Sequence, residues 1–251
     1  MARQQSTSEE NVREWPAWIL PLLVGIGVFS LSVLLLYYYF GPTPREILGL
    51  TPKSTASEAP VYAIVGNLDL SIPANYTRYE LQRAGGAQDT IDMHALLPDM
   101  QPFSADKAAA FDNNESNSDV IYFSVHTAGA TLRSDRRLDM VYARYLANPK
   151  PTADPYGMDH YAFKPDSAYA DQDLFVAKLD SEFEPLVVLI CDRETDLVPS
   201  PNCTRTLHLT DSVALTYRYK RSHRKDWQAI DKAIVALVRS FIVTDNGLAG
   251  G

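Results

Sequence analysis

Four histidines are the side chains of this 251-residue sequence that could most readily bind a metal or carry protons. His94, His126, His160 and His208 each fall in a different strand expected below. Metal sites usually include one pair of ligands close in sequence, as in HExxH, and these histidines offer no such pair. We therefore predict no metal site and expect the four side chains to make hydrogen bonds or to lie on a solvated sheet face.

A group of aspartates is the next candidate for chemistry. Four aspartates lie close together in the sequence: Asp159, Asp166, Asp171 and Asp173. They do not form an EF-hand calcium loop, because the glycine and the terminal glutamate of that loop are missing. Solvated acidic side chains in loops are the simpler interpretation. The motifs GxSxG, SxxK, GxxxxGK[ST] and GxGxxG are also absent. We predict no catalytic residue and no cofactor. A hydrolase site assembled from His126, His160, Asp159 and Asp171 remains the alternative.

The two cysteines are Cys191 and Cys203. Their spacing is too long for a CxxC redox motif or a zinc knuckle, and it suits the closure of one hairpin. A structural disulfide is predicted, with two free thiols as the alternative.

A run of basic residues stands out because the chain as a whole is acidic, with 31 acidic and 23 basic residues and a formal charge of −8. The run precedes the last predicted helix and contains Arg218, Lys220, Arg221, Arg224 and Lys225. It is either a solvated corner or a docking patch for anionic lipid headgroups or an acidic protein. The acidic balance argues against nucleic acid as a partner.

The elements that position these residues follow an N-terminal apolar segment. No residue between Glu14 and Arg45 is charged, and 17–40 is almost wholly apolar, which is long enough to span a bilayer. Tryptophans at one end and tyrosines at the other are typical of the headgroup boundary. We predict a tail (1–14), a transmembrane segment (15–40) and a proline-rich linker (41–60), and we expect the bilayer to be one partner.

The positive-inside rule does not decide on which side of the membrane the C-terminal domain lies, because Arg3 and Arg13 before the helix balance Arg45 and Lys53 after it. Two weaker arguments decide it instead. A short tail is easily kept in the cytoplasm, and a disulfide needs an oxidising compartment. The sequence therefore predicts that the C-terminal domain lies outside the cytoplasm.

One domain is expected at 61–243, followed by a disordered tail at 244–251. Its alternating or short apolar runs predict about eight strands. These are 61–72, 90–95, 120–127, 158–163, 174–178, 186–191, 204–209 and 213–219. The connections within the pairs 174–178/186–191 and 204–209/213–219 are too short for parallel crossovers, so both pairs should be antiparallel hairpins.

Two amphipathic helices are predicted at about 135–147 and 225–243, and a third short helix at 105–111. The long C-terminal helix needs one apolar surface to cover. The sequence therefore predicts an α+β fold, with a mainly antiparallel sheet and this helix packed on one face.

Several segments together resemble uncharacterised bacterial single-pass membrane proteins with a periplasmic domain. They are IPANYTRY at 72–79, Arg83 with Gly85-Gly86, LLPDM at 96–100, and the stretch from Cys203 through Tyr217-Arg218-Tyr219 to Trp227 and Ile230-Asp231. The resemblance implies an inner-membrane anchor and no activity. We therefore predict a membrane-tethered, non-catalytic interaction domain, acting as an accessory subunit, an inhibitor or an immunity-like protein with an envelope protein as partner. A passive spacer is a further alternative.

Overall fold

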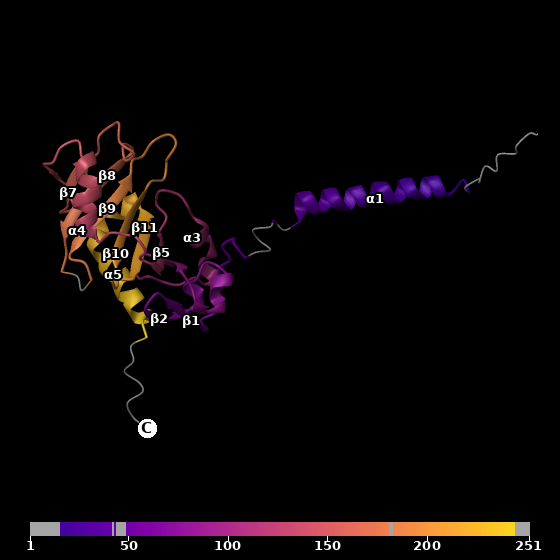
Figure 1. The fold of residues 1–251 in the computed structure, drawn as a ribbon, viewed down its shortest axis with the longest axis horizontal. Coiled ribbons are helices and arrows are strands. Elements are labelled where there is room, and N and C mark those ends of the chain that lie inside the picture. Colours follow the sequence, from indigo (N-terminus) through magenta and orange to yellow (C-terminus); the bar gives the residue numbers. More distant parts are fainter. Residues whose placement is uncertain (1–15, 42, 44–48, 181–182, 244–251) are drawn as a thin grey trace, which may run out of the picture. The chain divides into compact units, whose positions relative to one another are not determined.

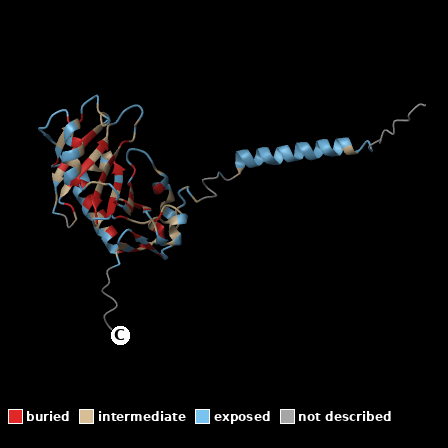
Figure 2. Cartoon of the chain, viewed as in Figure 1, coloured by how far each residue is buried: buried red, intermediate tan, exposed pale blue. Residues whose placement is uncertain are grey.

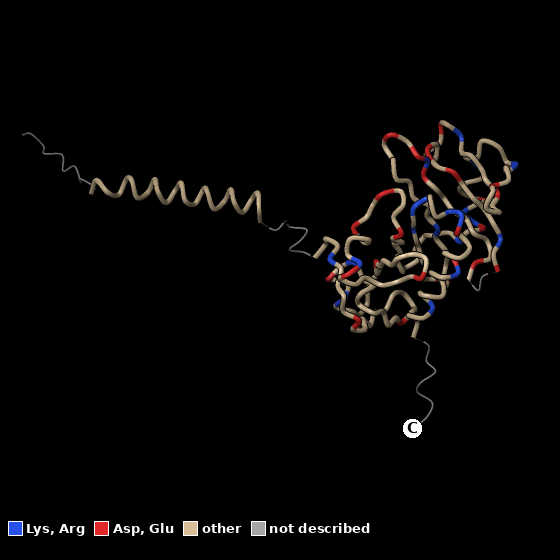
Figure 3. Tube along the Cα trace, turned by 180° about the vertical axis from the view of Figure 1, so that it is seen from behind, with Lys and Arg blue, Asp and Glu red and all other residues tan. Residues whose placement is uncertain are grey.

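The computed structural model describes residues 16–41, 43, 49–180 and 183–243, and it divides the chain into two units at residues 48 and 49. The first unit contains helix α1 (Ile19–Phe40), which is long and apolar enough to cross a membrane, with a mean hydropathy of 2.6. Figure 2 shows this helix exposed along its length, and Figure 3 shows no charged residue in it. Among the described residues of that unit, none buries the apolar side chains of the helix.

The second unit contains two sheets (Figure 1). The small sheet has the order β2-β1-β3, with β1 at Pro60–Val65, β2 at Leu68–Pro73 and β3 at Gly86–Ala87. The large sheet has eight strands in the order β4-β5-β11-β10-β9-β8-β7-β6, and all its neighbours are antiparallel. Its strands are β4 (Thr90–Leu96), β5 (Val120–Thr127), β6 (Thr152–Ala153), β7 (Asp159–Ala162), β8 (Gln172–Lys178), β9 (Leu186–Asp192), β10 (Asn202–His208) and β11 (Val213–Lys220). The two predicted hairpins are confirmed.

The helices of this unit are short except for the last. The α-helices are α3 (Ala108–Asp112), α4 (Ser134–Arg137) and α5 (Trp227–Phe241). The unit also contains the short 3-10 segments η1 (Ala74–Tyr76), η2 (Leu81–Ala84), η3 (Ala105–Lys107), η5 (Ala143–Tyr145) and η6 (Arg221–Asp226), and the π-helical segment η4 (Leu138–Tyr142). The helix predicted at 135–147 corresponds to the continuous run α4-η4-η5, and the one predicted at 225–243 corresponds to α5. The predicted α+β class is confirmed.

The strand predicted at 61–72 is two strands, which is the main departure from the sequence prediction. Gly66 and Asn67 turn the chain between β1 and β2, and Gly66 has φ +57. A Cβ at this position would also lie 2.8 Å from Val213. The turn therefore needs glycine for its conformation and for its space.

The spacer predicted at 41–60 is partly packed on the domain. Lys53 donates its backbone amide to the carbonyl of Arg78 (2.7 Å), and Pro52 bridges to Tyr79. The compact unit accordingly begins at Gly49.

Helix α5 covers one face of the large sheet, which we call the inner face. Trp227, Ile230, Ile234, Val238 and Phe241 are buried and belong to the main hydrophobic core. The red ribbon segments of Figure 2 lie along the strands under this helix. Burying such a stripe removes large apolar area from water and is the main source of stability for this layer.

A buried ion pair fixes α5 to the sheet. The guanidinium of Arg205 on β10 contacts the carboxylate of Asp231 on α5, and both side chains are almost completely buried. The Tyr217 hydroxyl donates to the same carboxylate at 2.5 Å, and Arg205 also donates to the Glu184 carbonyl at 3.2 Å. These bonds satisfy charges that would be costly to bury alone, so they define the position of the helix on the sheet.

Candidate functional site

Among the residues that the structure describes, the opposite, outer face of the large sheet is covered only at its two ends. Over β8 and β9, the side chains of Tyr142 and Leu146 pack on Leu174, Val176 and Val188 in a second core. At the other end, Phe111 packs on β4 and β5 in a third core. The middle strands β5, β11 and β10 lie between these covers.

Strand alternation gives this middle region a polar surface. The register pairs Ser124 with Thr216 and Thr206 with Thr216, so these side chains share one face, while the intervening Leu215 and Tyr217 face the inner core. The Oγ1 atoms of Thr206 and Thr216 are 2.9 Å apart, and Thr216 also lies 3.0 Å from the His126 Nε2 atom. Hydroxyl groups thus form the floor of a shallow depression that we call the outer groove.

The outer groove has two hollows, one lined by Thr216 and the other by Thr206, and these two side chains are hydrogen-bonded to each other. The first, of about 220 Å³, is lined by Arg78, Asp92, Met93, Tyr122, Phe123, Ser124, Thr216, Tyr217 and Arg218. The second, of about 260 Å³, is lined by Arg137, Tyr142, Gln172, Val188, Ile190, Asp192, Thr204 and Thr206. The floor offers hydrogen-bond donors and acceptors, and arginines lie at both ends.

In the first hollow two arginines contact one tyrosine. The guanidinium carbons of Arg78 and Arg218 lie 4.5 and 5.1 Å from the ring centre of Tyr122. Arg218 stands directly opposite Tyr122 in the β5–β11 register, whereas Arg78 precedes β4 and donates its backbone amide to Asp92 on that strand. We call these three side chains the Arg–Tyr–Arg stack. Cation–π attraction holds each charge against the ring.

Beside the second hollow the sheet opens. Only Cys203 and Thr204 of β10 pair with β9, so the backbone that follows has no strand partner on that side. The chain satisfies these groups with side chains: Arg137 donates to the Thr206 carbonyl (2.8 Å), and the His208 amide donates to the Glu184 carboxylate (2.9 Å).

Glu184 is the buried group that closes this opening. Its other carboxylate oxygen accepts the backbone amide of Ser134 at 3.0 Å, at the start of α4. Burial alone would raise the pKa of the Glu184 carboxyl, but the hydrogen bonds from Ser134 and His208 lower it below 4.5. Glu184 therefore stays ionised at neutral pH and fixes α4 beside the groove.

The five basic residues predicted as one docking patch do not share an exposed surface. Lys220 is buried and donates to Asn114 and to the Ser200 carbonyl. Of the others, Arg218 lies on the outer face, while Arg221 and Arg224 contact Phe175 in the inner core. Lys225 is exposed in η6, just before α5. Only Arg218 lines the outer groove.

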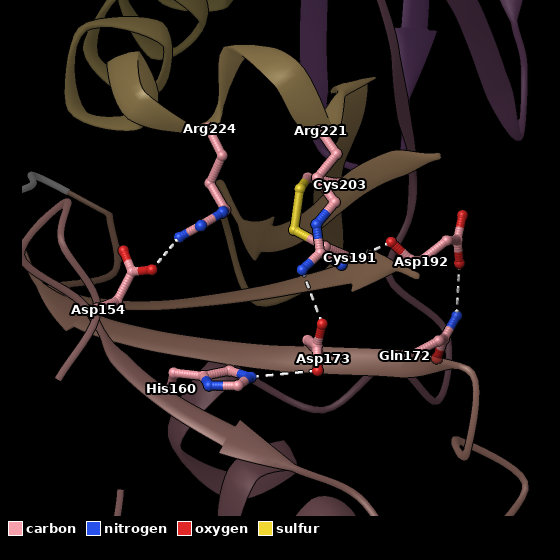
Figure 4. Close-up of a disulfide and its surroundings, with 9 residues drawn as sticks. All are labelled: Asp154, His160, Gln172, Asp173, Cys191, Asp192, Cys203, Arg221 and Arg224. Carbon is pink, nitrogen blue, oxygen red and sulfur yellow. Dashed lines mark hydrogen bonds and ion pairs between the residues drawn. A yellow bond between two sulfur atoms is a disulfide. The ribbon is translucent and has the colours of Figure 1, made fainter. Parts of the chain in front are cut away.

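The two arginines of η6 are neutralised by aspartates, as Figure 4 shows. Arg221 donates to Asp173 at 2.7 Å, and Arg224 lies 2.5 Å from Asp154. Asp173 also accepts hydrogen bonds from Arg193 (3.0 Å) and lies 3.1 Å from His160 Nε2. Burial would raise the pKa of Asp173, but the bonds from Arg221, Arg193 and His160 lower it below 3.8.

The cysteine pair lies at disulfide distance, in agreement with the spacing argument. Cys191 and Cys203 are directly opposite each other on β9 and β10, with Cα atoms 4.0 Å apart, and the bond joins the strands at the point where their pairing stops (Figure 4). A link at this place limits how far the sheet can open.

The histidines and aspartates considered for a hydrolase do not converge. His126 lies on β5 and His160 on β7, with β11, β10, β9 and β8 between them in the sheet. Asp159 and Asp171 are exposed, as is Asp166, whereas Asp173 belongs to the ion cluster described above. Of the other histidines, His94 is buried against Phe111, and His208 is buried 3.1 Å from Glu184.

Sequence reasoning missed Arg78, Tyr122 and Glu184. Each acts through residues distant in the sequence, so no local spacing identifies it. The available signal was the polar face of the middle strands, where serine and threonine alternate with core residues.

Comparisons with known proteins show a shared fold only. No protein-family model and no curated protein matches the chain. An immunity protein of the Stenotrophomonas maltophilia type IV secretion system is similar in structure, with 14% identity over 75% of this chain and 95% of that chain and a TM-score of 0.55. The Neisseria meningitidis iron-regulated outer membrane lipoprotein FrpD gives 12% identity over 76% and 96%, with a TM-score of 0.49.

Proposed function

We propose that this chain is a membrane-tethered, non-catalytic interaction domain of a bacterial cell envelope, which binds another protein through the outer groove. Accessory subunits, inhibitors and immunity-like proteins work in this way. The observation that carries the proposal is the open polar floor on β5, β11 and β10, because a sheet face left uncovered between two packed ends has hydrogen-bonding capacity that the domain itself does not use up.

Two further observations support the proposal. The fold is similar to that of an immunity protein of a type IV secretion system, which agrees with the immunity-like role among those proposed. Helix α1 has the length and composition of a membrane span, which would hold the domain at a bilayer. We propose that it is an inner-membrane anchor with the domain outside the cytoplasm, where the pair Cys191–Cys203 is stable as a disulfide.

Site-specific photocrosslinking of the full-length chain in its native host tests the function. A photoreactive residue at Thr216, in the groove floor, should give an adduct of discrete mass, and one at the exposed Thr152 on β6 should not. Adducts of the same mass from both positions, or from neither, would contradict a binding site in the groove.

A blocking variant gives a second readout. Ser124 lines the first hollow, and replacing it with Trp would fill much of the hollow's volume of about 220 Å³. We expect Ser124→Trp to abolish the crosslink from Thr216, while Thr152→Trp leaves it intact. Near-ultraviolet circular dichroism of both variants confirms that each is folded.

A further inference from the structure

The Arg–Tyr–Arg stack differs from the other arginines of the sheet and of η6 in having no anionic partner. Arg193, Arg205, Arg221 and Arg224 each lie within ion-pair distance of an aspartate. Within the described parts of the chain, the guanidiniums of Arg78 and Arg218 form no hydrogen bond or ion pair, and both lie against aromatic rings. The fold therefore brings two positive charges to one tyrosine without an ion-pair partner for either.

This arrangement has an electrostatic cost that an anion would remove. Both guanidiniums lie within about 5 Å of the same ring centre, so the two like charges repel each other. Each guanidinium also carries five N–H donors in a fork that matches a carboxylate. A carboxylate in the hollow that both arginines line would attract both guanidiniums and gain charge-assisted hydrogen bonds from them.

The surroundings of the stack indicate how the anion is presented. Ser124 and Thr216 continue the floor away from the arginines, and their hydroxyls suit the backbone of an extended peptide. Asp92 lines the same hollow, but its carboxylate accepts a hydrogen bond from Gln82 and forms no ion pair with either arginine. The two guanidiniums therefore outnumber the one carboxylate in the hollow, which suits an acidic side chain on an extended segment.

We propose that the Arg–Tyr–Arg stack is the recognition site for an aspartate or glutamate side chain on an extended segment of the partner protein. This rests on the proposed function and adds the chemistry of the ligand. Arg78 and Arg218 bind the carboxylate, and Tyr122 is a positioning residue that keeps the two charges at one place.

Peptide binding to the full-length chain in neutral-detergent micelles tests the proposal. The probes are fluorescein-labelled hexaglutamate and hexaglutamine, followed by fluorescence anisotropy. Hexaglutamate should bind at least about tenfold more tightly than hexaglutamine, which corresponds to about 1.4 kcal/mol, and its binding should weaken as salt rises. The double variant Arg78→Gln/Arg218→Gln should remove this preference.

Matched controls separate the stack from general electrostatics. Lys225→Gln/Lys232→Gln removes the same net charge from exposed positions on and before α5 and should leave hexaglutamate binding unchanged. Tyr122→Leu retains both arginines and should lose part of the affinity. An equal loss in the lysine variant, or no loss in the arginine variant, would overturn the proposal.

Two further outcomes are informative. If phosphatidylglycerol in the micelles competes with hexaglutamate and the arginine variant relieves the competition, the stack binds lipid headgroups and the proposal is wrong. The Thr216 crosslink does not depend on the charge of the partner. A crosslink without hexaglutamate binding would therefore refute the carboxylate chemistry alone, whereas hexaglutamate binding without a crosslink would refute the proposed function.

Discussion

Acidification should destabilise the domain through His94 well before its carboxylates protonate. His94 is 4% exposed, its ring centre lies 4.5 Å from that of Phe111, and its Nε2 atom has no hydrogen-bond partner. Burial lowers the pKa of His94 from 6.5 to about 3, and the positive charges of Arg78 and Arg83 act in the same direction. The folded domain therefore holds a neutral imidazole that the unfolded chain would protonate.

The direction of the effect follows from proton binding. Between pH 6.5 and about 3 the unfolded state binds more protons than the folded state at His94, so stability falls as the pH falls. From pH 7.5 to pH 5 the loss from this group is about 2 kcal/mol, or roughly 4–8 °C in Tm for a domain of this size. The pKa values of Asp173 and Glu184 are lowered in the folded domain, so both carboxylates stay ionised and keep their contribution to stability above pH 5.

Thermal unfolding of the full chain, followed by near-ultraviolet circular dichroism at pH 7.5, 6 and 5, measures this loss. His94→Phe should reduce the pH dependence because no proton can bind there, whereas His126→Gln, at a half-buried site on the groove, should retain it. A wild-type Tm that is constant over this range would refute the reasoning. If Tm falls as steeply with pH in His94→Phe as in the wild type, the pH dependence belongs to another group.

Three other outcomes are expected. Arg205→Met should lower the free energy of unfolding, measured by chemical denaturation, by about 3–5 kcal/mol because it leaves Asp231 buried without its cation. The double variant Arg205→Met/Asp231→Leu should recover most of that loss. Additive effects of the two substitutions would contradict the coupling. Cys191 and Cys203 should resist thiol labelling under denaturing, non-reducing conditions, and their replacement by serine should cost about 3 kcal/mol. Alkaline phosphatase fused after Gly251 should be active, and an inactive fusion would place the domain in the cytoplasm.

Local patterns in the sequence were sufficient for most of the elements. The strand predicted at 120–127 is β5 itself, and the helix predicted at 225–243 contains α5, because each is marked by a strong hydrophobic period. Where the prediction failed, at 61–72, the buried positions change from 61, 63 and 65 to 70 and 72 across the Gly66–Asn67 turn. The continuous apolar run at 61–65 hides this change of phase, so the Gly-Asn pair was the signal for the turn.

The candidate site was less predictable because it depends on pairing between distant strands. Tyr122 and Arg218 become neighbours only through the β5–β11 register, and Arg78 joins them from a segment that precedes β4. The opening between β9 and β10 likewise depends on Glu184 taking the place of a strand partner. Neither arrangement has a signature within a single window of sequence.

The run of basic residues shows why charge counted along the chain differs from charge on a surface. Along β11 successive residues face opposite sides of the sheet, so Arg218 and Lys220, two positions apart, both point to the outer face. Segment η6 then carries Arg221 and Arg224 to the inner side. Aspartates from β8 and from the loop before β7 neutralise those two. The charge that remains available for binding is therefore set by which arginines the fold leaves without a carboxylate, and this depends on acidic residues far away in the sequence. Of the arginines that line the first hollow, Arg218 and Arg78 both meet this criterion, and Arg78 lies outside the run.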